Sequence, residues 1–167
     1  MTQKTATEKD MFLQTFEREC QTTLKLMRAY PANKADLKPH EKSKSARELA
    51  WVFVLEQGMA SAALKGQLDF SKPMPPAPAN YTDIFAAFEN SSRELATQVS
   101  RASDEDLGRP ISFPVGPGKM GEFRRFDVIW MTLHDQIHHR GQLSVYLRLA
   151  GAKVPSIYGP TADEPWR

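Results

Sequence analysis

The chain has 167 residues, of which 41% are hydrophobic and 25% charged, a composition typical of a globular protein with one core. Its 22 basic and 20 acidic residues give a net charge of +2 without a long block of one sign, which disfavours nucleic acid as a partner. The single cysteine, Cys20, excludes an internal disulfide, and no apolar stretch is long enough for a membrane span or a signal peptide. We therefore expect one cytoplasmic domain over residues 1–167, with no membrane partner.

Apolar side chains recur every three or four residues in four segments, which predicts four amphipathic helices. The first runs from about Glu8 to Ala29 and ends before Pro31. The second begins at a capping box of Ser45 and Glu48 and reaches about residue 68. A linker with four prolines, 69–80, leads to a third helix that begins near residue 80 or 82 and ends near 102.

Residues 103–124 carry the only β-like pattern, and their glycines and prolines allow at most a short hairpin. The fourth helix begins near residue 126 and ends before Gly151, a natural C-terminal stop. Four helices without a convincing strand predict an all-α fold, a four-helix bundle with an irregular or short hairpin crossing before the last helix. The 12-residue linker is long enough to cross one end of the bundle, so the spacing leaves the topology open.

Three of the four histidines lie in the segment HDQIHHRGQ of the last helix. His134 and His138 are four residues apart, as are Asp135 and His139, so each pair presents two side chains one above the other. Histidine and carboxylate side chains are common ligands of zinc, nickel and iron. Either pair is therefore a candidate for part of a metal site.

The helical wheel separates these two pairs. Asp135 and His139 share a mainly apolar stripe, which we expect to face the bundle interior. Its other members are Val128, Met131, Gln142 and Tyr146. His134 and His138 lie about 100° further round, towards a neighbouring helix, a partner subunit or solvent.

Glu56 is the only charged residue on one apolar stripe of the second helix. A buried carboxylate is costly unless it is paired or bound to a metal, so Glu56 is predicted either to pair with a cation such as Arg140 or to bind a metal. With Asp135 and His139 it would form a three-ligand site with open coordination positions. Around that site we expect a pocket lined by Val52, Gln142 and Tyr146.

Several segments resemble the DinB-like family of bacterial proteins. HHRGQLSVYLRLAG followed by KVPSIYGP resembles the family's last helix and tail, and LKPHEKS with SARELAW resembles the start of its second helix. The resemblance implies a four-helix bundle, often a homodimer, with a divalent metal bound by three histidines. It also implies relatives that are transferases, hydrolases or isomerases and use low-molecular-weight thiols.

The resemblance places the family's last metal ligand at His139, its partner at Asp135 and the ligand from the second helix at Val52. Valine cannot bind a metal, and Glu56 lies one turn further on as a replacement. We therefore expect a divalent metal site, zinc, nickel or iron, that serves thiol transfer to a small molecule or its hydrolysis. The alternative is a metal-free dimer that binds a small ligand or a partner through a degenerate site.

Overall fold

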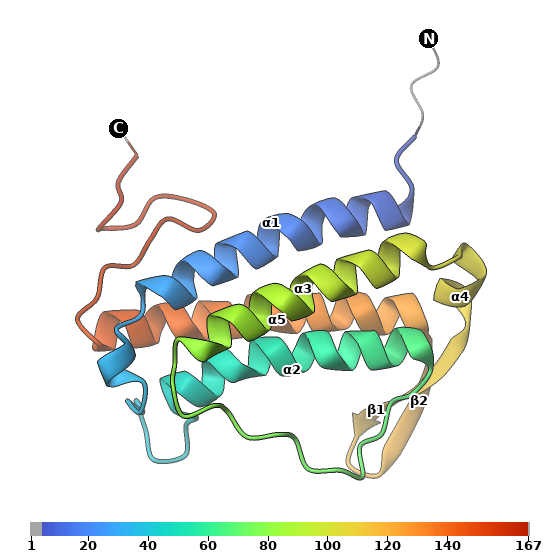
Figure 1. The fold of residues 1–167 in the computed structure, drawn as a ribbon, viewed down its shortest axis with the longest axis horizontal. Helices are drawn as coiled ribbons and strands as arrows, with labels where there is room; N and C mark the ends of the chain where they lie inside the picture. The colour runs from blue at the N-terminus through green and yellow to red at the C-terminus, as the bar shows by residue number, and fades with distance from the viewer. Residues whose placement is uncertain (1–4, 167) are drawn as a thin grey trace.

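A computed structural model describes residues 5–166 and shows a bundle of four long helices with a hairpin before the last one (Figure 1). This architecture confirms the predicted fold. The elements in chain order are α1 (Glu8–Ala29), the 3₁₀ turn η1 (Ala32–Lys34), α2 (Ala46–Lys65), α3 (Asp83–Arg101), α4 (Asp104–Gly108), β1 (Pro110–Gly116), β2 (Lys119–Arg124) and α5 (Arg125–Leu149). Among the described residues, no helix combines the length and the apolar composition needed to cross a membrane.

The helix ends follow local signals in the sequence. Ser45 accepts a hydrogen bond from the Glu48 amide, and the Glu48 carboxylate accepts one from the Ser45 amide, so the predicted capping box is formed. Gly66 ends α2 at a φ of 71°, where a side chain would be strained. The last residue of α2, Lys65, lies three residues before the predicted end near residue 68.

Helices α1 and α2 each pack against both α3 and α5. Lys9 at the start of α1 reaches the carbonyl of Ala102 just beyond α3, so α1 and α3 are antiparallel. Arg125 at the start of α5 likewise reaches the carbonyl of Leu64 at the end of α2. The pairs α1–α3 and α2–α5 are therefore both antiparallel (Figure 1).

The linker between α2 and α3 runs along the length of the bundle, which makes these two helices parallel (Figure 1). Contacts with α2 hold it in place: Trp51 donates to the Pro75 carbonyl over 2.8 Å, and Arg47 donates to the Ala79 carbonyl over 2.7 Å. The spacing in the sequence is equally compatible with a path across one end of the bundle. The lengthwise path fixes the topology that spacing left open.

The segment between α3 and α5 holds one element that the sequence analysis missed. Ser103 caps the short helix α4 by accepting a hydrogen bond from the Asp106 amide. The antiparallel hairpin follows, with Pro110 opposite Arg124 and Phe113 opposite Gly121. A serine three residues before an aspartate was the available signal for α4.

Aromatic and aliphatic side chains fill the bundle interior, where Phe12, Phe53 and Phe88 are almost fully buried. A polar layer crosses this core. Gln136 donates to the Thr23 hydroxyl over 3.2 Å, and Gln57 donates to the Ser92 hydroxyl over 2.8 Å. Because buried amides are costly without partners, these bonds hold the four helices in one register.

Candidate metal centre

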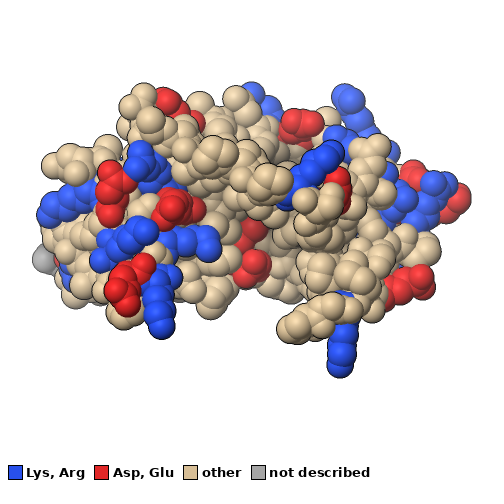
Figure 2. All heavy atoms as spheres, turned by 90° about the horizontal axis from the view of Figure 1, so that it is seen from below, with Lys and Arg blue, Asp and Glu red and all other residues tan. Residues whose placement is uncertain are grey.

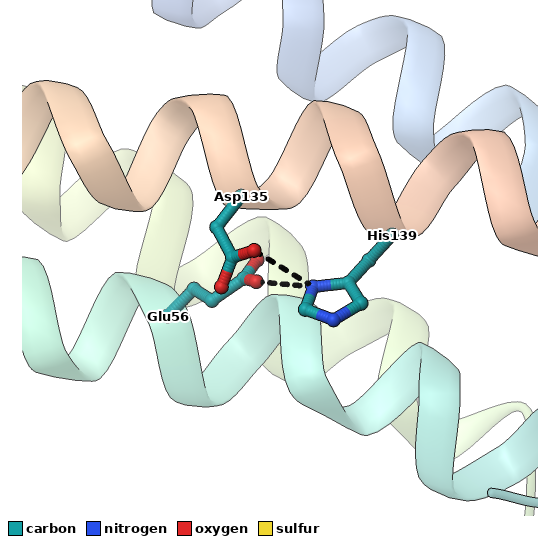
Figure 3. Close-up of side chains that lie close together, drawn as sticks. All are labelled: Glu56, Asp135 and His139. Carbon is teal, nitrogen blue, oxygen red and sulfur yellow. Dashed lines mark hydrogen bonds and ion pairs between the residues drawn. The ribbon is translucent and has the colours of Figure 1, made fainter. Parts of the chain in front are cut away.

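The antiparallel packing of α2 and α5 brings Glu56 beside Asp135 and His139 (Figure 3). The Nδ1 atom of His139 lies 2.7 Å from the Oε1 atom of Glu56 and 3.7 Å from the Oδ1 atom of Asp135. One ligand atom from each residue lies within 4.8 Å of the others. Across the described part of the chain, these are the one group of three potential metal ligands that lie close together.

The three side chains range from buried to exposed. The Glu56 side chain is 4% exposed and that of His139 19%, whereas that of Asp135 is 52% exposed. The expectation that the whole stripe faces the interior is therefore wrong for Asp135 and also for Gln142, which is exposed. The buried line of α5 passes through Gln136 and Arg140, and Asp135 lies on the edge next to α2. The cluster therefore has a buried floor and an open side.

Burial dominates the electrostatics of Glu56. Burial raises the pKa of this carboxyl to about 7. The hydrogen bond with His139 acts in the opposite direction but is the weaker effect. That same hydrogen bond raises the pKa of His139 above its ordinary value, although partial burial opposes this. The two groups therefore hold a shared proton more tightly than either would in water.

One oxygen of Glu56 has no partner in the described structure. Its Oε2 atom is buried and accepts no hydrogen bond, while Oε1 contacts His139. A buried acceptor without a partner costs free energy, which a proton or a cation at this position would recover. The unpaired oxygen, the imidazole and the exposed Asp135 carboxylate suit a divalent cation with open coordination positions. These residues thus fit a metal.

The other predicted site residues lie outside this cluster. His138 and Gln142 are exposed and contact each other over 2.9 Å, and His134 lies against the Trp130 ring. Tyr146 is buried and donates to the Lys44 carbonyl over 2.9 Å at the far end of α5. Val52 is half-buried, one turn before Glu56. None of these five side chains belongs to the three-ligand group.

A cavity of about 420 Å³ adjoins the cluster on the side of the hairpin. Met59 of α2, Phe113 of β1 and Met131 of α5 line it together with Asp135. The alternative pair, His134 and His138, also borders this cavity. Seen from the side of α2, acidic side chains lie in a hollow among uncharged residues (Figure 2). The helical wheel placed Met131 beside Asp135, but no pattern in the sequence indicated that the hairpin brings Phe113 here.

A larger groove of about 870 Å³ lies between α1 and α3. Phe16, Cys20 and Phe88 line its floor, and none of the three candidate ligands borders it. Of these two hollows, the small cavity is the one that borders a candidate ligand.

A second polar cluster lies on another face of α5. Arg140 forms a buried ion pair with Glu19 over 2.7 Å, so it is not the partner of Glu56. Tyr158 of the C-terminal tail donates to Glu19 over 2.6 Å, and its ring lies 5.0 Å from the Arg140 guanidinium carbon. Burial alone would raise the pKa of Glu19, but the hydrogen bonds from Tyr158 and Arg140 lower it below its ordinary value.

Comparison with known proteins gives a consistent result. A sequence model of the DinB family matches residues 1–166. The chain is 26% identical to the uncharacterized protein YrdA of Bacillus subtilis (strain 168) over 158 residues, which cover 93% of this chain and 90% of that protein.

Solved structures have the same fold. A DinB-like protein from Bacillus cereus ATCC 10987 superposes with a TM-score of 0.73 at 21% identity, covering 88% of this chain and 95% of the other. The DinB-like protein YjoA of Bacillus subtilis gives a TM-score of 0.70 at 19% identity, covering 88% and 97%.

Proposed function

The chain belongs to the DinB family, and from this premise we propose that it binds a divalent metal ion through Glu56, Asp135 and His139. The observation that carries the proposal is the buried Oε2 atom of Glu56, which has no partner among the described residues and lies in a group of three potential ligands. Zinc, nickel and iron all accept this mixture of one imidazole and two carboxylates.

We propose further that the site serves thiol transfer to a small molecule or its hydrolysis. A bound metal lowers the pKa of a coordinated water or thiol and so supplies a nucleophile near neutral pH. Glu56 and His139 are held by the packed faces of α2 and α5, so they form the rigid part of the site. Asp135 stands at the open side, where a small substrate and a low-molecular-weight thiol have access.

Metal content measured by mass spectrometry on protein purified without a His-tag or metal resin tests the metal site. We expect close to one zinc, nickel or iron per chain in the wild type, and a loss of at least tenfold in Glu56→Gln and in His139→Ala, because each removes a ligand. The matched control is His134→Ala, which removes an exposed histidine of the same helix outside the group and should retain the metal. Equal loss in all three variants, or a wild type that takes up no added zinc, contradicts the proposal.

One observation favours the metal-free alternative as the second candidate. The 2.7 Å contact gives Glu56 and His139 a partner in each other without any metal. In that case the bundle, as a homodimer, binds a small ligand or a partner protein, and His139→Ala changes only the free energy of unfolding, by about 1–3 kcal/mol. Metal content and unfolding measured on the same variant separate the two candidates.

A further inference from the structure

The cavity beside the candidate metal centre shares a residue with the three-ligand cluster. Asp135 belongs to both, so the cavity opens directly on one proposed ligand. Met59 follows Glu56 by one helical turn, and Met131 precedes Asp135 by one turn. The cavity therefore continues the metal site along the groove between α2 and α5, towards the hairpin.

The walls of the cavity are mostly apolar. Two methionine side chains and the Phe113 ring supply polarisable surface that adapts to ligands of different shape. Thr132 also borders the cavity, but its hydroxyl donates a hydrogen bond to the Ile129 carbonyl over 2.8 Å. The imidazoles of His134 and His138 border the cavity as well. Among the described residues that line it, Asp135 is the one acidic residue, and none is a lysine or arginine. The Asp135 carboxylate without a basic side chain beside it disfavours an anionic ligand, and the apolar walls suit a neutral one.

The hairpin places Phe113 through packing that the sequence specifies. The Phe113 ring meets Phe70 of the linker edge-on at 5.7 Å and Phe123 of β2 at 6.4 Å. Opposite Phe113 in the hairpin register is Gly121, where an added Cβ would lie 2.8 Å from Val115 and 3.0 Å from Phe123. The linker and β2 thus hold Phe113 as a fixed wall of the cavity.

We propose that this cavity binds the apolar part of the substrate and that the substrate is a small neutral molecule with a compact aromatic or alkyl group. Its volume of about 420 Å³ lies at the lower end of the range for small-molecule sites, which limits the size of that group. Met59, Phe113 and Met131 are then the residues that determine specificity. The proposal rests on the proposed function, since it takes the metal centre as the place of reaction.

The test is a titration of metal-free protein, labelled with ¹³C at the methionine methyl groups, with benzyl alcohol as the probe. We expect saturable shifts of the Met59 and Met131 methyl signals, assigned by Met→Leu substitution, and none at the exposed Met11 and Met74. Benzoate at the same concentration should give clearly smaller shifts because of the Asp135 carboxylate. Shifts that are equal at all four methionines, or equal for benzoate, overturn the proposal.

Variants of the hairpin sharpen this test. Phe113→Ala should weaken benzyl alcohol binding roughly tenfold, because it removes one wall of the cavity. The matched control is Val115→Ala, an exposed position of the same strand outside the lining, which should leave binding unchanged. Met59→Trp fills the cavity from α2 and should abolish binding without touching the hairpin. Unchanged binding in Phe113→Ala or in Met59→Trp overturns the proposal.

A repeat of the titration with cobalt(II) separates the failure of this proposal from that of the proposed function. Uptake of cobalt with paramagnetic broadening of the benzyl alcohol protons supports both the metal centre and the cavity as a substrate site. If cobalt is taken up but benzyl alcohol then shifts neither Met59 nor Met131, the cavity proposal alone is overturned. Shifts at both methionines without any uptake of cobalt overturn the metal centre, and with it the role of the cavity as a substrate site.

Discussion

Helix α5 carries two clusters of polar residues on different faces, and they differ in how completely their groups are paired. In the first, Arg140 and Glu19 are both buried, and Tyr158 donates to the same carboxylate. In the second, Glu56 is equally buried, but its Oε2 atom has no partner within residues 5–166. In a buried group that is fully paired, the partners offset the cost of desolvation, whereas a group left unpaired is available for a ligand. The comparison thus separates a structural cluster from a candidate functional one.

The largest expected effect is on the structural cluster. Arg140→Ala leaves the Glu19 carboxylate buried without its cation, so we expect the free energy of unfolding to fall by about 3–5 kcal/mol in urea denaturation. The double variant Glu19→Leu, Arg140→Met removes both charges and should recover most of this loss. A single variant as stable as the wild type would show that the two clusters do not differ in this way.

The next effect concerns the candidate functional cluster. Zinc at about 100 times its Kd should stabilise the wild type by about 2.7 kcal/mol, because it binds the folded chain and not the unfolded one. Glu56→Gln keeps the shape of the side chain but removes its charge, so zinc should give this variant no comparable gain. Urea denaturation with and without zinc measures both, and an equal gain in the variant would exclude Glu56 as a ligand.

A smaller effect should follow from the C-terminal tail. Tyr158→Phe deletes only the hydroxyl that donates to Glu19, and hydrogen bonds to charged groups contribute about 1.5–3 kcal/mol. We expect a loss near the lower bound, because the residue is 64% exposed and water can replace the hydroxyl. The zinc-induced gain of this variant should equal that of the wild type. A change in zinc binding would mean that the two clusters are coupled through α5.

The smallest expected effect is a dependence of stability on pH. The pKa of Glu19 is lower in the folded chain than its ordinary value of 4.5, so the folded state favours the ionised carboxylate. Its contribution to stability is therefore fully present above about pH 4.5 and is lost as the pH falls through the lower, folded pKa. In urea denaturation between pH 6 and 3, the wild type should lose more stability than Glu19→Gln. Parallel curves would contradict this assignment.

The helices were predictable because their signals are local. The periodicity and the capping box of Ser45 and Glu48 placed the helix ends within a few residues of those observed. The path of the linker was not predictable, since it depends on contacts such as that between Trp51 and Pro75, which lie 24 residues apart. Local patterns define elements, whereas their arrangement depends on residues distant in sequence.

The candidate site was predictable in its members and not in its exposure. Glu56 stood out as the one charge on an apolar stripe, and Asp135 with His139 had the spacing of helical neighbours. The wheel gives directions around one helix only, so it could not show that Asp135 lies at the edge of the bundle. The sequence allowed Arg140 as the partner of Glu56, but Arg140 forms its ion pair with Glu19, which lies 121 residues earlier.

The parallel arrangement of α2 and α3 has a consequence for how the chain can be divided. A cut in the linker 69–80 would leave α1 and α2 on one fragment and α3 and α5 on the other. Each helix of the first fragment packs against both long helices of the second, so the core forms only when the fragments meet. Separately produced halves should therefore assemble into one bundle and behave as a split protein. The candidate metal site has Glu56 on one half and His139 on the other, so metal binding would then indicate that the two halves have assembled.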